Sequence, residues 1–193
     1  MWTSEDQPIV LDWLRGPWTG RIGLTFAPGK RQDVRQGAPW DRDLHADVAR
    51  LSDVYGVSSL VSLIEDHEFV SLGIEELPEV AARHGIAVMR MPIPDGACPP
   101  DVVSLHELVE RILLAADAGG SVAIHCRGGL GRAGTVGGCV LRAAGLSGEE
   151  ALAEIKRARG DGAPQSAQQH QFVREYAPLR RAWRADAETA AMD

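Results

Sequence analysis

The amino-acid sequence predicts an α/β domain built on a largely parallel sheet. Short apolar segments with the composition of strands alternate with longer segments whose apolar residues recur at helical spacing. The strand-like segments cover residues 21–26, 57–64, 86–91 and 122–126. A length of 193 residues is enough for one domain with a proper core. We therefore expect a single domain with a sheet of four to five strands flanked by helices.

The first third of the chain is expected to contain an arm, a strand and a helix. Residues 1–20 include three tryptophans and two prolines, and we expect them to lie on the domain as an N-terminal arm packed through its aromatic rings. Residues 21–26, RIGLTF, have the composition of a strand, and a polar loop over residues 29–39 follows. Asp41 is a candidate N-cap for the next helix, which Gly56 ends.

The middle third adds two strands with a short helix between them. The strand over residues 57–64 ends in an acidic segment, EDHE, at residues 65–68. In an open parallel sheet the carboxyl ends of the strands line the ligand crevice, so this segment is placed to face a site. The same residues also suit the first turn of a helix, where the helix dipole favours negative charge. A helix over residues 78–84 and a strand over residues 86–91 follow.

The last part of the chain is expected to be mostly helical. A long amphipathic helix over residues 102–118 precedes the fourth strand, and a helix over residues 133–142 follows that strand. The next helix, over residues 147–159, begins with a serine followed three residues later by a glutamate, which is the signature of a capping box. We expect a last helix over residues 168–183 and a C-terminal tail over residues 185–193.

The sequence SVAIHCRGGLGRAGT at residues 121–135 carries the clearest chemical signal. A strand ends at His125 and Cys126, a glycine-rich turn follows, and Arg132 leads into a helix. Such a turn at a helix N-terminus gathers backbone N–H groups around an anion, and the arginine adds a planar fork that holds two oxygens. The helix dipole and the arginine also favour the thiolate form of Cys126. A thiolate beneath a phosphate cradle predicts attack on phosphorus.

Other interpretations of this segment are weaker. Gly129, Gly131 and Gly134 match the dinucleotide-binding pattern, but they come late in the chain, and no acidic residue ends a following strand. No Lys-Ser/Thr pair follows the glycines, as a nucleotide-binding P-loop requires. A sulfurtransferase would share a cysteine loop, but we expect a shorter loop there and no acid upstream. A purely structural cysteine does not explain a position between a histidine and a glycine-rich turn.

A proline-rich segment after the third strand supplies a candidate acid. Residues 92–100 place Asp95 between proline and Gly96, on a loop that leaves a strand end. Cleavage of a phosphomonoester needs a group that protonates the leaving oxygen, and a carboxyl beside the crevice can do this. An aspartate before glycine is also common in turns. The neighbouring Cys126 loop favours the acid role.

The motif HCRGGLGR, with five residues between Cys126 and Arg132, resembles the signature of the cysteine-dependent protein phosphatases. From about residue 20 to residue 183, the chain is similar to dual-specificity phosphatases of the kinase-associated phosphatase type. Besides the motif, the matching pieces are PGK at 28–30, DVR at 33–35, PI and DG within 92–96, and GA with two glutamines within 162–169. The resemblance implies a protein tyrosine phosphatase-like catalytic domain over residues 21–184.

The resemblance also implies roles for further residues. In the family, a glutamine pair four residues apart positions the water that hydrolyses the phosphoenzyme; Gln165 and Gln169 have this spacing, and neighbouring glutamines leave the assignment open. His125 is expected to orient the cysteine region through its ring N–H groups. Family loops usually follow the arginine with serine or threonine, whose hydroxyl stabilises the departing thiolate, and this chain has Ala133 there. Hydrolysis of the intermediate is the step that this departure affects.

Composition and charge indicate which cellular compartment and which kinds of partner to expect. The net charge is −7 and the pI is about 5.4, which does not favour nucleic acid or membrane surfaces as partners. Three cysteines do not make a secreted disulfide framework, no metal-ligand spacing occurs, and the acidic N-terminus lacks the regions of a signal peptide. We expect a cytoplasmic protein that needs no metal or organic cofactor. The sequence leaves its oligomeric state open.

The sequence thus predicts a phosphomonoester hydrolase with a cysteinyl-phosphate intermediate. Cys126 attacks phosphorus, while Asp95 protonates the leaving oxygen and then deprotonates the incoming water. The equatorial oxygens are held by the N–H groups and the arginine fork of a cradle made of Arg127, Gly128, Gly129, Leu130, Gly131 and Arg132. The expected partner is a protein phosphorylated on tyrosine, serine or threonine. Two alternatives stay open: a phosphatase of phosphoinositides or small phosphoesters, and a phosphate-binding interaction module with little turnover.

Overall fold

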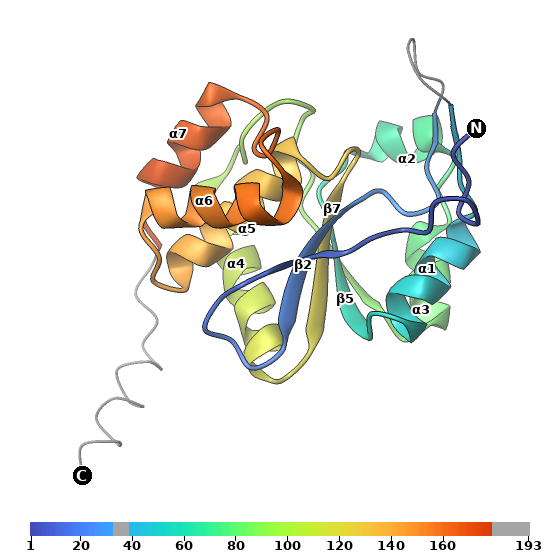
Figure 1. Cartoon of the computed structure of the whole chain (residues 1–193), viewed down its shortest axis with the longest axis horizontal. Coiled ribbons are helices and arrows are strands. Elements are labelled where there is room, and N and C mark those ends of the chain that lie inside the picture. The colour runs from blue at the N-terminus through green and yellow to red at the C-terminus, as the bar shows by residue number, and fades with distance from the viewer. Residues whose placement is uncertain (33–38, 179–193) are drawn as a thin grey trace.

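The fold is organised around a five-stranded sheet (Figure 1). The computed structural model describes residues 1–32 and 39–178. The strands follow the order β1–β2–β7–β5–β6, with β1 antiparallel to β2 and the other neighbours parallel. Their bounds are Asp12–Leu14 for β1, Arg21–Phe26 for β2, Val57–Ser62 for β5, Ala87–Arg90 for β6 and Ser121–Cys126 for β7. The expected α/β class, with a mainly parallel sheet of four to five strands, is confirmed.

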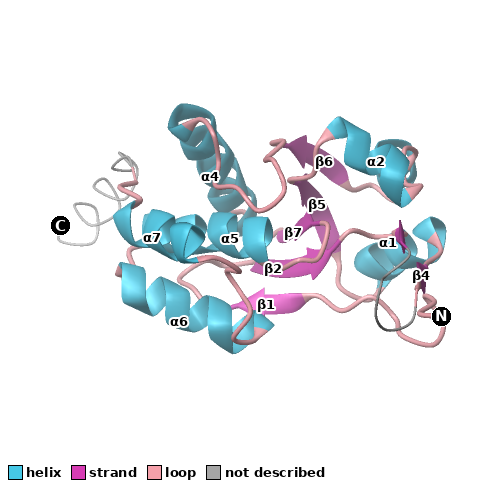
Figure 2. Cartoon of the chain, turned by 90° about the horizontal axis from the view of Figure 1, so that it is seen from above, coloured by secondary structure: helices cyan, strands magenta, loops and turns pink. Residues whose placement is uncertain are grey.

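Helices cover both faces of this sheet (Figures 1 and 2). The helices within the described residues are α1 (Leu44–Asp53), α2 (Asp66–Leu72), α3 (Leu77–Arg83), α4 (Val102–Asp117), α5 (Gly131–Ala143), α6 (Gly148–Arg159) and α7 (Ala167–Glu175). α4 and α5 pack against β2 and β7, whereas α1 packs against β5 and α3 against β6. Every residue of β7 is therefore buried, as expected for a central parallel strand. The loops after β5, β6 and β7 meet at the carboxyl edge of the sheet.

The segment before α1 contains a short hairpin that the sequence did not indicate. Arg31–Gln32 (β3) pairs antiparallel with Trp40–Asp41 (β4). The N-cap of α1 is instead Asp43, whose side chain accepts a hydrogen bond from the Ala46 N–H at 2.8 Å. The expected cap at Asp41 is wrong because two nearby aspartates both suit the position, and the hairpin uses the first of them.

Part of the N-terminal arm is built into the sheet. Residues 12–14 form β1, which pairs with β2 and continues the sheet by one strand. Leu11 and Leu14 are almost fully buried, so this segment contributes to the core. The expectation that residues 1–20 only lie on the domain is therefore corrected. A strand of three residues is too short to show an alternating pattern.

The C-terminal helices differ in how well the sequence predicted them. Ser147 and Glu150 form the expected capping box of α6, with hydrogen bonds of 2.8 and 3.3 Å. α7 ends at Glu175, earlier than expected, because Pro178 disfavours helical backbone in the residue before it. Four remaining expectations lie outside the described residues: the DVR piece at 33–35, a helix over 179–183, a domain boundary at 184 and a tail over 185–193.

Within residues 1–32 and 39–178, the structure contains no helix with the length and apolar character needed to cross a membrane.

Candidate active site

Cys126 is the last residue of β7 and lies at the floor of the cradle loop, residues 126–132. Its side chain is almost fully buried, and its Sγ accepts a hydrogen bond from the Gly129 N–H at 3.2 Å. Gly129 has a φ of 73°, and a β-carbon there would lie 2.5 Å from the carbonyl carbon of Thr25 in β2. Only glycine fits this position without strain. The loop therefore folds tightly over the sulfur.

The carbonyl oxygens of the cradle loop are held from outside by two cationic side chains. Lys30 Nζ donates to the Arg127 carbonyl at 3.4 Å. Arg159 donates from Nε to the Gly129 carbonyl at 2.9 Å and from Nη2 to the Gly128 carbonyl at 3.2 Å. In a trans peptide the N–H points away from the C=O, so the N–H groups that follow these carbonyls point into the loop. This is the arrangement that an anion cradle needs.

Arg132 lies in the first turn of α5 and is only 1% exposed. Its Nη1 and Nη2 donate to the two carboxylate oxygens of Glu68, at 2.5 and 2.9 Å. Nη1 also donates to the Ile93 carbonyl at 2.9 Å, and Nη2 pairs with Asp95 Oδ1 at 2.9 Å. These contacts fix the plane of the guanidinium, while its Nε donates to no described residue. An anion in the loop can take the Nε–H and displace Asp95 from Nη2.

Glu68 shows that both interpretations of the acidic segment 65–68 are right. Its Oε2 accepts the Glu65 N–H at 2.9 Å in a capping box at the start of α2, and its carboxylate also binds Arg132. Burial alone would raise the pKa of Glu68, but the hydrogen bonds from Arg132 and from the Glu65 backbone outweigh burial and lower it. The segment therefore caps a helix and faces the site.

Asp95 comes from the acid loop, residues 92–100, and reaches the cradle loop through Arg132. Its side chain is 66% exposed. The acid loop is anchored at both sides of Asp95, because the Ile93 N–H donates to the Leu63 carbonyl at 3.0 Å and Gln169 Nε2 donates to the Ala97 carbonyl at 3.1 Å. An exposed carboxyl on an anchored loop beside the arginine suits proton delivery to a leaving group.

The two candidate water-positioning glutamines have different surroundings. Gln165 lies against the cradle loop, since a β-carbon at Gly131 would be 2.5 Å from its Oε1. Gln169 is fully buried, and its Oε1 accepts the N–H groups of Gln165 and Ser166 at 3.1 and 3.3 Å. The amide of Gln169 thus joins α7 to the acid loop, and it also lies beside the cradle, since a β-carbon at Gly131 would be 3.1 Å from both its Nε2 and its Oε1.

His125 is fully buried in β7, directly before the cysteine. Its Nδ1 lies 3.4 Å from the Cys126 carbonyl oxygen, which can only accept, so Nδ1 carries the proton in this contact. Its Nε2 is buried without a hydrogen-bond partner among the described residues. Burial lowers the pKa of His125 to about 4, so the ring is neutral near pH 7. The neutral ring therefore lies against the Cys126 carbonyl at the end of β7.

This burial predicts a pH-dependent loss of stability. The pKa of His125 is 6.5 in the unfolded chain and about 4 in the folded protein, so between these values the unfolded chain binds the extra proton. Stability is expected to fall as the pH decreases from 6.5 towards 4, by about 3 kcal/mol from this residue. Urea unfolding of wild type and His125→Asn at several pH values measures it. The acid-side slope should flatten in His125→Asn and persist in the exposed control His67→Asn; equal slopes in all three proteins would contradict the assignment.

Sequence reasoning missed the positions of Lys30 and Arg159 against the cradle loop. The Lys30 ammonium is buried and lies 3.8 Å from the ring centroid of Trp40. Burial lowers the pKa of Lys30 to about 8, although negative charge on Cys126 acts in the opposite direction. Both cations are far from residues 126–132 in the sequence, so no local spacing links them. One local signal is Gly29, which directly precedes Lys30 and has a φ of 70°, a backbone conformation that favours glycine.

In the part of the chain that the structure describes, no hydroxyl takes the place of the one that serine or threonine would supply at position 133. Ala133 is fully buried, and Thr135 Oγ1 donates to the Gly131 carbonyl at 2.8 Å within α5. Among the described residues, the Gly129 N–H is the one hydrogen-bond donor to Cys126 Sγ. The same part of the chain contains no group of three or more histidine, cysteine, aspartate or glutamate side chains arranged to hold a metal ion.

This fold and site correspond to one class of enzyme. A cysteine at the end of the central strand, a glycine loop with inward N–H groups, a following arginine and an acid on a neighbouring loop form the arrangement of the protein tyrosine phosphatases. A family model described as "Swiss Army Knife protein, DSP-PTPase phosphatase domain" matches residues 41–188. The chain belongs to this family and is a cysteine-dependent dual-specificity phosphatase.

Individual relatives agree with this assignment. The chain is 29% identical over 179 residues to cyclin-dependent kinase inhibitor 3 of Sus scrofa and to that of Homo sapiens, covering 90% of this chain and 81% of each relative. It superposes on kinase-associated phosphatase carrying serine in place of its catalytic-site cysteine, with a TM-score of 0.78, 26% identity and coverage of 88% and 94% of the two chains. For Tk-PTP in its active form the TM-score is 0.60, with 32% identity and coverage of 81% and 90%. The resemblance to kinase-associated phosphatases is confirmed.

Proposed function

We propose that this phosphatase removes phosphate from proteins through a cysteinyl-phosphate intermediate on Cys126. The proposal is supported most strongly by the convergence of three groups, two from the cradle loop and one from the acid loop. Cys126 Sγ lies beneath the cradle loop, the Arg132 guanidinium is fixed by Glu68, and the Asp95 carboxyl lies 2.9 Å from Arg132 Nη2. These are a nucleophile, an oxyanion clamp and an acid within one small volume.

The reaction follows from these positions in two steps. Sγ attacks phosphorus while the loop N–H groups and Arg132 stabilise the charge on the three equatorial oxygens. The phosphate takes over Nη2 of Arg132, and the released Asp95, in its protonated form, gives its proton to the leaving oxygen as the P–O bond breaks. Water then attacks phosphorus, Asp95 accepts a proton from it, and the S–P bond breaks to return the thiolate and release inorganic phosphate.

The proposed substrates are proteins phosphorylated on tyrosine, serine or threonine. Relatives named cyclin-dependent kinase inhibitor 3 and kinase-associated phosphatase support a protein substrate over a phosphoinositide or a small phosphoester. We place the reaction in the cytoplasm, because all three cysteines are free and a reducing compartment keeps the Cys126 thiolate available.

Replacing the acid tests the mechanism. Asp95→Asn is expected to lower kcat/KM about a hundredfold for phosphopeptides, whose leaving oxygen needs a proton, and less than about threefold for an aryl phosphate with an acidic phenol. Steady-state kinetics on both substrate types measure this difference. Asp101→Asn is the matched control, because Asp101 caps α4 and is exposed. Equal losses of Asp95→Asn on both substrates, or a leaving-group effect in Asp101→Asn, would remove Asp95 from the acid role. Hydrolysis of a soluble phosphoinositide but of no phosphopeptide would contradict the proposed substrate class.

A further inference from the structure

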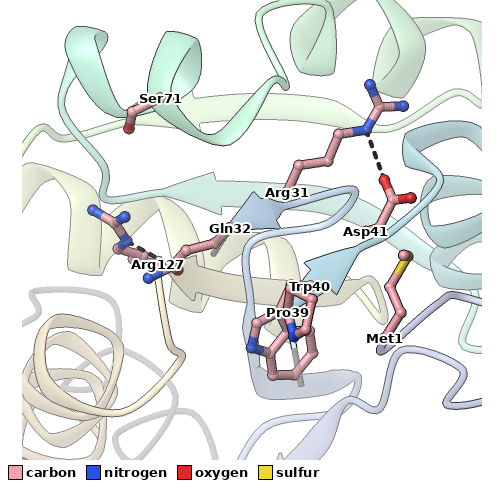
Figure 3. A pocket seen from close by; sticks show the side chains of 8 residues that line it. All are labelled: Met1, Arg31, Gln32, Pro39, Trp40, Asp41, Ser71 and Arg127. Atoms are coloured by element: carbon pink, nitrogen blue, oxygen red, sulfur yellow. Dashed lines mark hydrogen bonds and ion pairs between the residues drawn. The ribbon is translucent and has the colours of Figure 1, made fainter. Parts of the chain in front are cut away.

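A pocket of about 560 Å³ opens directly beside the cradle loop (Figure 3). We call it the Arg127 pocket; its walls include Arg127, Arg31, Gln32, Trp40, Asp41 and Ser71. Arg127 follows Cys126 in the sequence, so one side chain of the cradle loop also forms a wall of the pocket. A group bound there lies next to the phosphate that the cradle loop would hold.

The charges around the Arg127 pocket suit one additional anion. Arg127 Nε donates to Gln32 Oε1 at 3.2 Å, and its two terminal nitrogens have no hydrogen-bond or ion-pair partner among the described residues. Arg31 is paired with Asp41 at 3.5 Å, and both side chains are more than half exposed, so they largely compensate each other. Among the described walls of the pocket, the unpaired end of Arg127 therefore leaves a net positive charge.

The aromatic ring that lines the Arg127 pocket, that of Trp40, packs against other aromatic rings and a cation. The Trp40 ring centroid lies 4.8 Å from that of Trp2 and 5.2 Å from that of Phe26. The buried Lys30 ammonium lies 3.8 Å from the same ring. An aromatic ring and the free terminal nitrogens of Arg127 line the same pocket, and together they suit a side chain with an aliphatic body and an anionic end.

We propose that the Arg127 pocket binds a second anionic side chain of the substrate protein, an acidic or phosphorylated residue within about three positions of the residue in the cradle loop. This proposal rests on the proposed function, because the pocket acts only while a phosphorylated residue occupies the cradle loop. The limit of three positions follows from the length of the Arg127 side chain and from the rise of about 3.3 Å per residue in an extended peptide. A polyanionic lipid headgroup fits the pocket less well, since the described walls offer its further charges no second unpaired cation: Arg31 is already paired with Asp41.

Phosphopeptides that differ at one flanking position test this inference. Peptides with glutamate, phosphoserine, glutamine or lysine at each position within three of a phosphotyrosine are compared by kcat/KM, and their affinity is measured with Cys126→Ser. Wild type is expected to favour glutamate or phosphoserine over glutamine by about tenfold at one position. Arg127→Met should reduce this ratio to about one, whatever its overall rate, and Arg83→Met, an exposed arginine in α3, should keep it.

A second variant separates binding from folding. Ser71→Asp adds a negative charge in the pocket from α2 without changing the cradle loop, and it should abolish the preference for glutamate while leaving hydrolysis of the glutamine peptide within about twofold. No preference in wild type, or a preference unchanged in Arg127→Met and Ser71→Asp, would overturn the pocket assignment. Because the glutamine peptide reports turnover without a second anion, its hydrolysis shows whether the proposed function itself holds. A larger rate on a soluble phosphoinositide than on every peptide would overturn the choice of a protein side chain.

Discussion

Cys126→Ser is expected to abolish turnover while preserving the fold and phosphate binding. Serine matches the size of cysteine, but its hydroxyl is far harder to ionise, and the described residues around Sγ include no base that takes its proton; the contact there is the Gly129 N–H donor. We expect kcat to fall by at least about four decades, which corresponds to over 5 kcal/mol at about 1.36 kcal/mol per decade.

The measurement is hydrolysis of p-nitrophenyl phosphate, together with vanadate binding by calorimetry. Cys98→Ser is the matched control, because Cys98 is a partly exposed free cysteine of the acid loop; it should keep activity within about threefold. Residual activity of Cys126→Ser above about one per cent of wild type, after exclusion of contaminating phosphatase, would contradict nucleophilic catalysis by this residue.

Arg132→Lys is expected to lose at least about a hundredfold in kcat/KM, or about 2.7 kcal/mol. A lysine ammonium is a point charge and cannot make the two-point contact with Glu68 while offering further N–H groups to phosphate. The buried Glu68 carboxylate would also lose one of its charge-assisted hydrogen bonds, so thermal stability should fall together with activity.

Kinetics and thermal unfolding of Arg132→Lys separate these two effects. Arg142→Lys provides the control, because Arg142 lies in the same helix and donates to the carbonyls of Leu146 and Tyr176, away from the cradle loop. It should change stability more than kcat/KM. An Arg132→Lys enzyme within about threefold of wild type would show that the arginine fork does not hold the transferring phosphate.

The elements that the sequence predicted well are those whose signal is local. β2 has the predicted bounds, Arg21–Phe26, because an apolar run ends at a proline-glycine turn. The capping box of α6 uses the predicted serine and glutamate because the two residues need only each other. The placement of Cys126 at the end of a buried strand and of Arg132 in the next helix also follows from one continuous segment.

The features that the sequence did not reveal depend on contacts between distant segments. Asp12–Leu14 forms the strand β1 because it pairs with β2; three residues alone do not carry a strand pattern. Arg159 meets the Gly128 and Gly129 carbonyls from the end of α6, and nothing in its own neighbourhood indicates this. The acidic segment 65–68 suggested both of its roles, but only the fold shows that Glu68 is the residue that binds Arg132.

The alanine at position 133 is expected to affect the second step of the reaction, the hydrolysis of the phosphoenzyme. A hydroxyl that hydrogen-bonds the departing thiolate would contribute about 1.5–3 kcal/mol. Its absence should slow hydrolysis of the phosphoenzyme by roughly ten- to a hundredfold, since Thr135 donates its hydroxyl to Gly131 instead. The intermediate should therefore accumulate in wild type and accumulate less in Ala133→Ser.

Direct detection of this intermediate is the most decisive measurement. The reaction is stopped with denaturant within the first turnover, and the phosphate is located by mass spectrometry of the peptide that contains Cys126. We predict a product burst close to one equivalent of enzyme, with phosphate on Cys126 Sγ and none in Cys126→Ser. Rapid turnover by wild type with no burst, and with no phosphate on Cys126 at any time, would contradict the cysteinyl-phosphate mechanism.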